Sequence, residues 1–163
     1  MSTAIIFATA HGSTEKAAEL LKKYLPDCES FNINTDSFDL SEYDTVIIGS
    51  YVKMGVFDKT VRKFVIKYYP HLMKIRTGLF MCSLMSENED KYWKNNYPPQ
   101  LVEKSVRGHF GCEFDVKKLH GIEKRIGKMV TRQNDEKGVY PTYQINEKAI
   151  KQFAEELKNS GIS

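Results

Sequence analysis

The stretch AIIFATAHGST, residues 4–14, decides the expected fold of this chain. Its first five residues are continuously apolar and partly β-branched, a pattern that predicts a short strand buried on both faces. A helical stripe follows, made of Ala17, Ala18, Leu20, Leu21, Tyr24 and Leu25. Residues 9–14 therefore connect the carboxyl end of a buried strand to the start of a helix, and Ser13 or Thr14 is the expected N-cap.

The rest of the chain repeats this alternation of strands and helices. Further strands are expected at residues 28–33, 45–50, 78–82 and 106–114, with a loop at 51–55. Helices are expected at residues 61–68, ending before Pro70, at 86–105 with an interruption at Pro98–Pro99, at 116–132, and after a cap at Asn146. This alternation predicts an α/β fold with a parallel sheet covered on both faces, and five strands favour a doubly wound sheet of order 2-1-3-4-5.

Length and composition fit a single domain spanning residues 1–163. The chain is 41% hydrophobic and has a formal net charge of +3, which gives no nucleic-acid signature. Its three cysteines have no paired spacing, so neither a disulfide scaffold nor a metal site is expected. The sequence shows no signal peptide and no apolar run of about 20 residues. We therefore expect a cytoplasmic protein without bound metal or nucleic acid.

The loop at residues 9–14 has the properties of an anion site. Backbone N–H groups at a helix start and the helix dipole attract anions, and Thr9, Ser13 and Thr14 add hydroxyl donors. The loop lacks the Gly-Lys-Ser/Thr ending of a Walker loop, and the Gly-x-Gly-x-x-Gly fingerprint does not occur in the chain. From this pattern alone, an ordinary helix start is an equally good interpretation.

Several segments resemble known flavin proteins. Thr9, Gly12 and Thr14 match the Thr/Ser-x-Thr-Gly-x-Thr phosphate loop of flavodoxins, with His11 in place of the usual third-position threonine. The segments YDTVIIGSYVKMG (43–55) and LFMCSL (79–84) are similar to the flavodoxin-domain branch that contains the menaquinone-dependent protoporphyrinogen dehydrogenases. The late amphipathic helix and the tyrosines that follow it, Tyr140 and Tyr143, are also similar. The resemblance implies a flavodoxin-like five-stranded sheet.

It further implies that three loops hold FMN. The phosphate would contact Thr9, Ala10, His11, Gly12, Ser13 and Thr14. One side of the isoalloxazine would lie against Ser50, Tyr51, Val52, Lys53, Met54 and Gly55. The other side would be approached by Ser83, Leu84 and Met85, together with Tyr92 or Trp93. The alternative for Tyr51, Met54 and Trp93 is packing within their loops, and for Lys53 it is plain solvation. No catalytic residue is assigned.

Three classes of function follow from this resemblance. The favoured one is an FMN-binding redox protein that passes electrons to or from a protein or small-molecule partner. The second is an FMN-dependent oxidoreductase of the protoporphyrinogen/quinone type, which acidic residues Glu87, Glu89 and Asp90 disfavour because the substrate is anionic. The third is a cofactor-free binding module. A receiver domain and a low-molecular-weight tyrosine phosphatase are excluded, because their acidic clusters and Cys-x5-Arg motif are absent.

The positive charge is concentrated in the helix expected at residues 116–132. This segment has six Lys or Arg residues and one Glu, a net +5, so the remainder of the chain sums to −2. One interpretation is a core-packed helix with a solvated basic face. The other is a docking face for an acidic partner or for an anionic membrane surface, which would place the protein at the membrane periphery.

Overall fold

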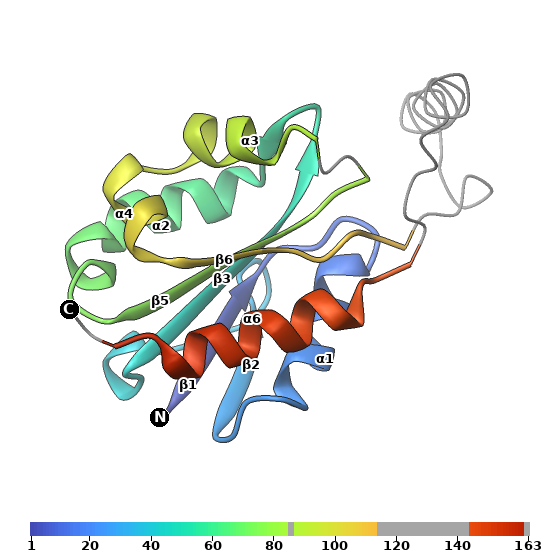
Figure 1. The fold of residues 1–163 in the computed structure, drawn as a ribbon. Coiled ribbons are helices and arrows are strands. Elements are labelled where there is room, and N and C mark those ends of the chain that lie inside the picture. Colours follow the sequence, from blue (N-terminus) through green and yellow to red (C-terminus); the bar gives the residue numbers. More distant parts are fainter. Residues whose placement is uncertain (85–86, 114–143, 162–163) are drawn as a thin grey trace, which may run out of the picture.

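A parallel sheet forms the centre of the computed structural model, which describes residues 1–84, 87–113 and 144–161 (Figure 1). Its order within these residues is β2-β1-β3-β5-β6. The strands are β1 (Thr3–Phe7), β2 (Cys28–Asn32), β3 (Thr45–Lys53), β5 (Arg76–Cys82) and β6 (Val106–His109). The short β4 (Val56–Phe57) pairs antiparallel with the end of β3. The predicted order is confirmed for the five parallel strands.

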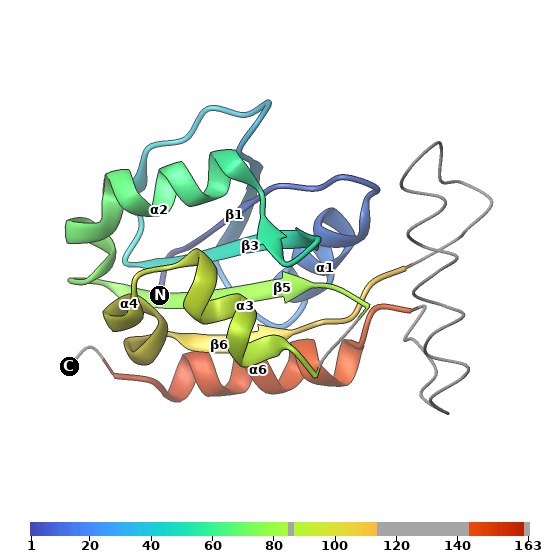
Figure 2. The same ribbon diagram turned by 90° about the horizontal axis from the view of Figure 1, so that it is seen from above.

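Helices cover both faces of the sheet, as Figure 2 shows. One face carries α1 (Ser13–Lys22) and α6 (Glu147–Asn159). The other carries α2 (Lys59–Leu72), α3 (Glu89–Asn96) and α4 (Pro99–Lys104), while a 3-10 turn η1 (Leu40–Glu42) precedes β3. Because both faces are covered, β1 is buried along its whole length, which explains its continuous apolar sequence.

Alternate strand residues enter two separate apolar layers. Ile6 and Ile48 pack toward α2, whereas Ile5 and Ile47 pack toward α1 and α6. The second layer includes an aromatic row in which Phe80 stacks on Phe110 at 4.8 Å between centroids and Phe110 meets Phe153 edge-on at 5.3 Å. Each fully buried aromatic side chain of this kind contributes about 1.5–3 kcal/mol through burial.

Four local expectations are wrong in detail. Helix α2 runs through Pro70 to Leu72, because Pro70 lies in the exposed last turn and the buried Leu72 keeps that turn on the core. Residues 51–55 are not a loop, since β3 continues to Lys53 and turns back into β4. The last strand stops at His109, and Gly111, with φ of 68°, follows it. The N-cap of α1 is Gly12 rather than Ser13 or Thr14.

Other expectations are confirmed or fall outside the described residues. The helix interruption at Pro98–Pro99 separates α3 from α4. The cap at Asn146 is present, its side chain accepting a hydrogen bond from the Ala149 N–H at 3.1 Å. The helix expected at 116–132 lies outside the described ranges. In the part of the chain that the structure describes, no helix has both the length and the apolarity needed to cross a bilayer.

Candidate functional site

Three loops meet at the carboxyl edge of the sheet because their strands end in register. Phe7 of β1 lies beside Gly49 of β3, which lies beside Phe80 of β5. The segments that follow these strands therefore leave the sheet from one edge (Figure 1). In a doubly wound sheet this edge, beside the switch point between β1 and β3, is where ligands bind.

The first loop presents an open helix start. Gly12 adopts φ of 93° as the N-cap of α1, and no side chain caps this end. Thr9 braces the loop from within, its Oγ1 accepting the Gly12 N–H at 2.9 Å. By contrast, Asp58 caps α2 by accepting the N–H groups of Thr60 and Val61. The N–H groups at the start of α1 thus keep their affinity for an external anion.

Thr14, the second residue of α1, has a fully buried hydroxyl. Its Oγ1 is buried and has no hydrogen-bond partner of normal geometry among the described residues. The thiol of Cys82 lies near enough to interact with it, but burial dominates there and raises the pKa of Cys82. A buried hydroxyl without a partner is unfavourable by about 1–3 kcal/mol. A ligand oxygen at the start of α1 would supply the missing partner.

Ser13 is held by the chain instead of facing a ligand. Its Oγ donates to the Glu113 carbonyl at 3.1 Å and accepts the Glu113 N–H at 3.0 Å. The Glu113 carboxylate forms an ion pair with Lys16. A negative side chain therefore lies beside the first turns of α1, at the same edge as Thr14. The exposed Ala10 and His11 complete the loop.

The second loop is a tight hairpin rather than an irregular segment. Lys53 pairs with Val56, so Met54 and Gly55 form a two-residue turn with φ of 54° and 79°. Positive φ at both positions is the signature of a type I′ turn. Met54 is 80% exposed at the tip. The half-buried Val52 belongs to the strand leading into this turn.

Ser50 and Tyr51 fix the base of this hairpin on the start of α2. Ser50 Oγ donates to the Tyr51 carbonyl at 2.9 Å and accepts the Asp58 N–H at 3.0 Å. The Tyr51 hydroxyl donates to Asp58 Oδ2 at 2.9 Å. The phenol end of Tyr51 is thus anchored to α2, and the exposed Met54 side chain at the tip is the group that a flat ligand could contact.

Asn96 of α3 holds the tip of the hairpin. Its Nδ2 donates to the carbonyls of Gly55 at 3.1 Å and Tyr92 at 2.8 Å. Its Oδ1 accepts the Phe57 N–H at 3.0 Å. One side chain therefore bonds to the second residue of the turn and to the following strand β4. This role could not be predicted from the sequence, because Asn96 lies 41 positions from Gly55 and in no motif.

The third loop is tied to β6 by His109. Its Nε2 lies 3.0 Å from both the hydroxyl and the carbonyl oxygen of Ser83. Because a carbonyl only accepts, Nε2 carries the proton. Burial lowers the pKa of His109, although Glu89 and the Ser83 carbonyl act in the opposite direction. Leu84 is half-buried next to Ser83, and Met85 lies outside the described residues.

Trp93 is placed in the core rather than on the open edge. It is 1% exposed, meets Phe57 edge-on at 5.5 Å and stacks on Tyr97 at 6.2 Å. These contacts agree with the alternative given for Trp93 from the sequence, which is packing against the protein instead of against the flavin. The half-buried Tyr92 lies next to the hairpin, its ring 3.6 Å from the position of a Cβ added to Gly55.

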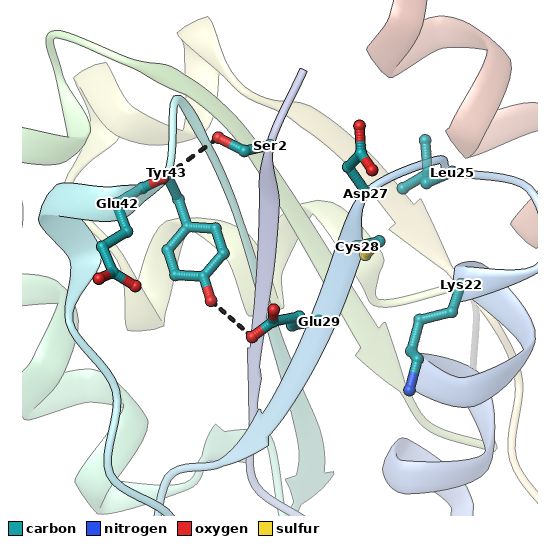
Figure 3. Close-up of a pocket in the computed structure, with 8 residues that line it drawn as sticks. All are labelled: Ser2, Lys22, Leu25, Asp27, Cys28, Glu29, Glu42 and Tyr43. Atoms are coloured by element: carbon teal, nitrogen blue, oxygen red, sulfur yellow. Dashed lines mark hydrogen bonds between the residues drawn. The ribbon is translucent and has the colours of Figure 1, made fainter.

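A separate surface pocket lies at the amino ends of β1 and β2, away from these loops (Figure 3). Its lining residues are Ser2, Lys22, Leu25, Asp27, Cys28, Glu29, Glu42 and Tyr43. The Tyr43 hydroxyl donates to Glu29 Oε2 at 2.7 Å. Burial raises the pKa of Cys28 to about 12, so its thiol is neutral at physiological pH. The described residues contain no cluster of His, Cys, Asp and Glu that could hold a metal ion.

Comparison with known families identifies the class of protein. A model described as a flavodoxin domain matches residues 4–139, which include all three loops. The chain belongs to the flavodoxin-domain family. A comparison with curated protein sequences gave no match.

Solved structures agree on the fold. A flavodoxin from the domain Archaea is 11% identical with a TM-score of 0.55, and the match covers 97% of this chain and 99% of that one. A Fusobacterium nucleatum flavodoxin bound to flavin mononucleotide is 14% identical with a TM-score of 0.51, covering 97% of each chain. Rubredoxin oxygen:oxidoreductase from Desulfovibrio gigas is 12% identical with a TM-score of 0.53, but only 36% of that chain is covered. At these identities the likeness establishes the fold.

Proposed function

We propose that this protein binds FMN at the carboxyl edge of its sheet and exchanges electrons through it with a protein or small-molecule partner. The observation that carries the proposal is the start of α1, where a helix end without a side-chain cap lies beside the buried Thr14 hydroxyl, a combination that suits an anionic group. The solved Fusobacterium nucleatum flavodoxin of this fold is bound to flavin mononucleotide. The three free cysteines fit a proposed cytoplasmic location.

The residues present have the chemistry to hold each part of FMN. The α1 N–H groups and Thr14 would bind the phosphate without a lysine, through neutral donors and the helix dipole. The hairpin tip, with Met54 and Gly55, would lie against one side of the ring, and the positive φ of Gly55 permits this tight turn. Ser83, oriented by His109, would lie on the other side. When bound, the flavin supplies the redox chemistry.

The protoporphyrinogen/quinone type of oxidoreductase is the finer alternative within this proposal. Glu89 and Asp90 stand in the first turn of α3, which follows the third loop. Two carboxylates at that place disfavour an anionic tetrapyrrole. We therefore propose electron exchange with a partner of different chemistry, and photoreduction of the FMN complex, followed by its visible spectrum, would show whether electrons enter singly or in pairs.

The proposal is tested by titrating the protein with FMN and following quenching of flavin fluorescence. Thr14→Ala removes the phosphate donor and should weaken binding by about 0.5–1.5 kcal/mol, roughly 2- to 12-fold. Thr60→Ala is the matched control, because Thr60 occupies the equivalent second position of the capped helix α2 and is exposed. Absence of quenching in the wild-type protein would refute the proposal. Equal affinity for both variants would remove Thr14 from the site.

A further inference from the structure

Helix α2 belongs to a long stretch of one-signed charge. Residues 59–86 contain no Asp or Glu. The same stretch contains six cations: Lys59, Arg62, Lys63, Lys67, Lys74 and Arg76. Asp58, which immediately precedes it, is used internally, since its carboxylate accepts the Tyr51 hydroxyl and the N–H groups of Thr60 and Val61. The positive charge of α2 is therefore not balanced along its own sequence.

Part of this charge lies on the solvent face of α2. Lys59, Lys63, Ile66 and Lys67 are exposed and share one side of the helix at spacings of three, four and eight residues. The opposite side packs Val61, Phe64, Val65 and Leu72 into the core. Within the described ranges, no ion pair involves a cation of α2. We call the four exposed residues the basic face of α2.

The basic face continues into the hairpin at the cofactor edge. The described residues have three exposed large apolar side chains, Met54, Val56 and Ile66, with exposures of 80%, 44% and 65%. All three fall within residues 54–66. Figure 2 shows the hairpin leading directly into α2. Seven residues of helix span about 10 Å, so the surface from the hairpin to Ile66 has the scale of a single protein contact.

We propose that the basic face of α2, together with the hairpin tip, is the docking surface for an electron-transfer protein that carries an acidic patch. The inference rests on the proposed FMN function. Charge complementarity would bring the partner to the hairpin, where the flavin edge would lie, and the apolar side chains would form the dry centre of the contact. A membrane surface fits less well, because the apolar side of α2 is already packed in the core, and among the described residues only Ile66 of α2, with Met54 and Val56 of the hairpin, could enter lipid.

The test uses an acidic plant-type [2Fe–2S] ferredoxin as the probe. Each reduced ferredoxin loses one electron, and two of them reduce one bound FMN with protons taken from water. Stopped-flow measurement at low salt gives the second-order rate, and fluorescence anisotropy of labelled ferredoxin measures association independently of flavin. Lys59→Glu/Lys63→Glu/Lys67→Glu should lower both the rate and the association constant at least tenfold and remove their salt dependence. Ile66→Ala should lower only the association constant, by about two- to fivefold.

The matched control reverses three exposed lysines of α6, Lys148, Lys151 and Lys158, which lie on the opposite face of the sheet. This variant changes the net charge equally and should retain most of the wild-type rate. Equal losses in both variants would overturn the proposal, because net charge alone would explain them. Wild-type binding to phosphatidylserine vesicles that the α2 variant loses would assign the face to a membrane instead. If the wild-type protein quenches FMN fluorescence but the α2 variant associates with ferredoxin as strongly as the wild type does, only this inference fails. If FMN does not bind, the proposed function fails first.

Discussion

Replacing Asn96 with alanine should loosen the hairpin at the proposed flavin edge. The change deletes two hydrogen bonds that join α3 to the hairpin, one from Nδ2 to the Gly55 carbonyl and one from the Phe57 N–H to Oδ1. A hydrogen bond contributes about 0.5–1.5 kcal/mol net, so their loss should lower the free energy of unfolding by about 1–3 kcal/mol. The third bond, to the Tyr92 carbonyl, stays within α3 and adds less.

Urea unfolding measures this loss directly. With a denaturant slope of about 2 kcal/mol per molar urea, a destabilisation of about 2 kcal/mol moves the midpoint by about 1 M. The midpoint temperature of thermal unfolding should fall by roughly 4–8 °C for a chain of this size. Asn95→Ala is the matched control, because Asn95 is the exposed neighbour on the same helix. Its midpoint should stay close to that of the wild-type protein.

Hydrogen exchange distinguishes the two hydrogen bonds that Asn96 makes to the hairpin. Asn96→Asp keeps an oxygen that accepts the Phe57 N–H but loses the donor to the Gly55 carbonyl. The Phe57 amide should therefore stay protected in Asn96→Asp and exchange faster in Asn96→Ala. The reasoning is refuted if Asn96→Ala and Asn95→Ala unfold at the same urea concentration, or if the Phe57 amide exchanges equally in all three variants.

Three further predictions concern single side chains. Burial lowers the pKa of His109 below its ordinary value of 6.5, so as the pH falls the unfolded chain takes up the proton before the folded one does. The free energy of unfolding should therefore fall as the pH drops below 6.5 and stay level above it. Urea midpoints of His109→Asn should lack this pH dependence. Glu113→Gln removes an anion beside α1 and releases Lys16 from its ion pair. At low salt the variant should bind FMN about two- to fivefold more tightly than the wild-type protein, and in 0.5 M NaCl the two should bind it equally. Burial raises the thiol pKa of Cys82, and that of Cys112 to about 12, so iodoacetamide at pH 8 should label both slowly until urea unfolds the chain.

The sheet was predictable because strands buried on both faces have a local apolar pattern in the sequence. The runs 4–8, 46–49 and 78–82 are continuously apolar, and strands covered on both faces need that composition. The order of the strands followed from the alternation with helices. The position of the first loop was predictable for a similar reason, since a buried strand and a helix start flank it; its use as an anion site stays a prediction.

The residues that hold the loops in place have no such local pattern in the sequence. Asn96 reaches Gly55 across 41 positions, His109 reaches Ser83 across 26, and Glu113 reaches Ser13 across 100. Each is a polar residue whose partner is a backbone group or a short side chain, so no spacing rule connects the pair. The Met54–Gly55 turn was missed for a different reason. Methionine is an unusual residue at positive φ, and the Asn-Gly or Asp-Gly signal of such turns is absent.

The two layers of the protein hold different parts of the site, and this separation leads to a last prediction. Thr14 lies with α1 on one face of the sheet, while Asn96 fixes the hairpin from α3 on the other. Among the described residues, the two side chains share no hydrogen-bond partner. Their effects on FMN affinity should therefore add to within about 0.5 kcal/mol when Thr14→Ala and Asn96→Ala are combined. Only Asn96→Ala should also shift the visible spectrum of the bound flavin, because in the proposed complex the hairpin faces the ring and α1 faces the phosphate. A coupling energy above about 1 kcal/mol would show that the phosphate loop and the hairpin move as one unit, and the two-layer account of the site would be wrong.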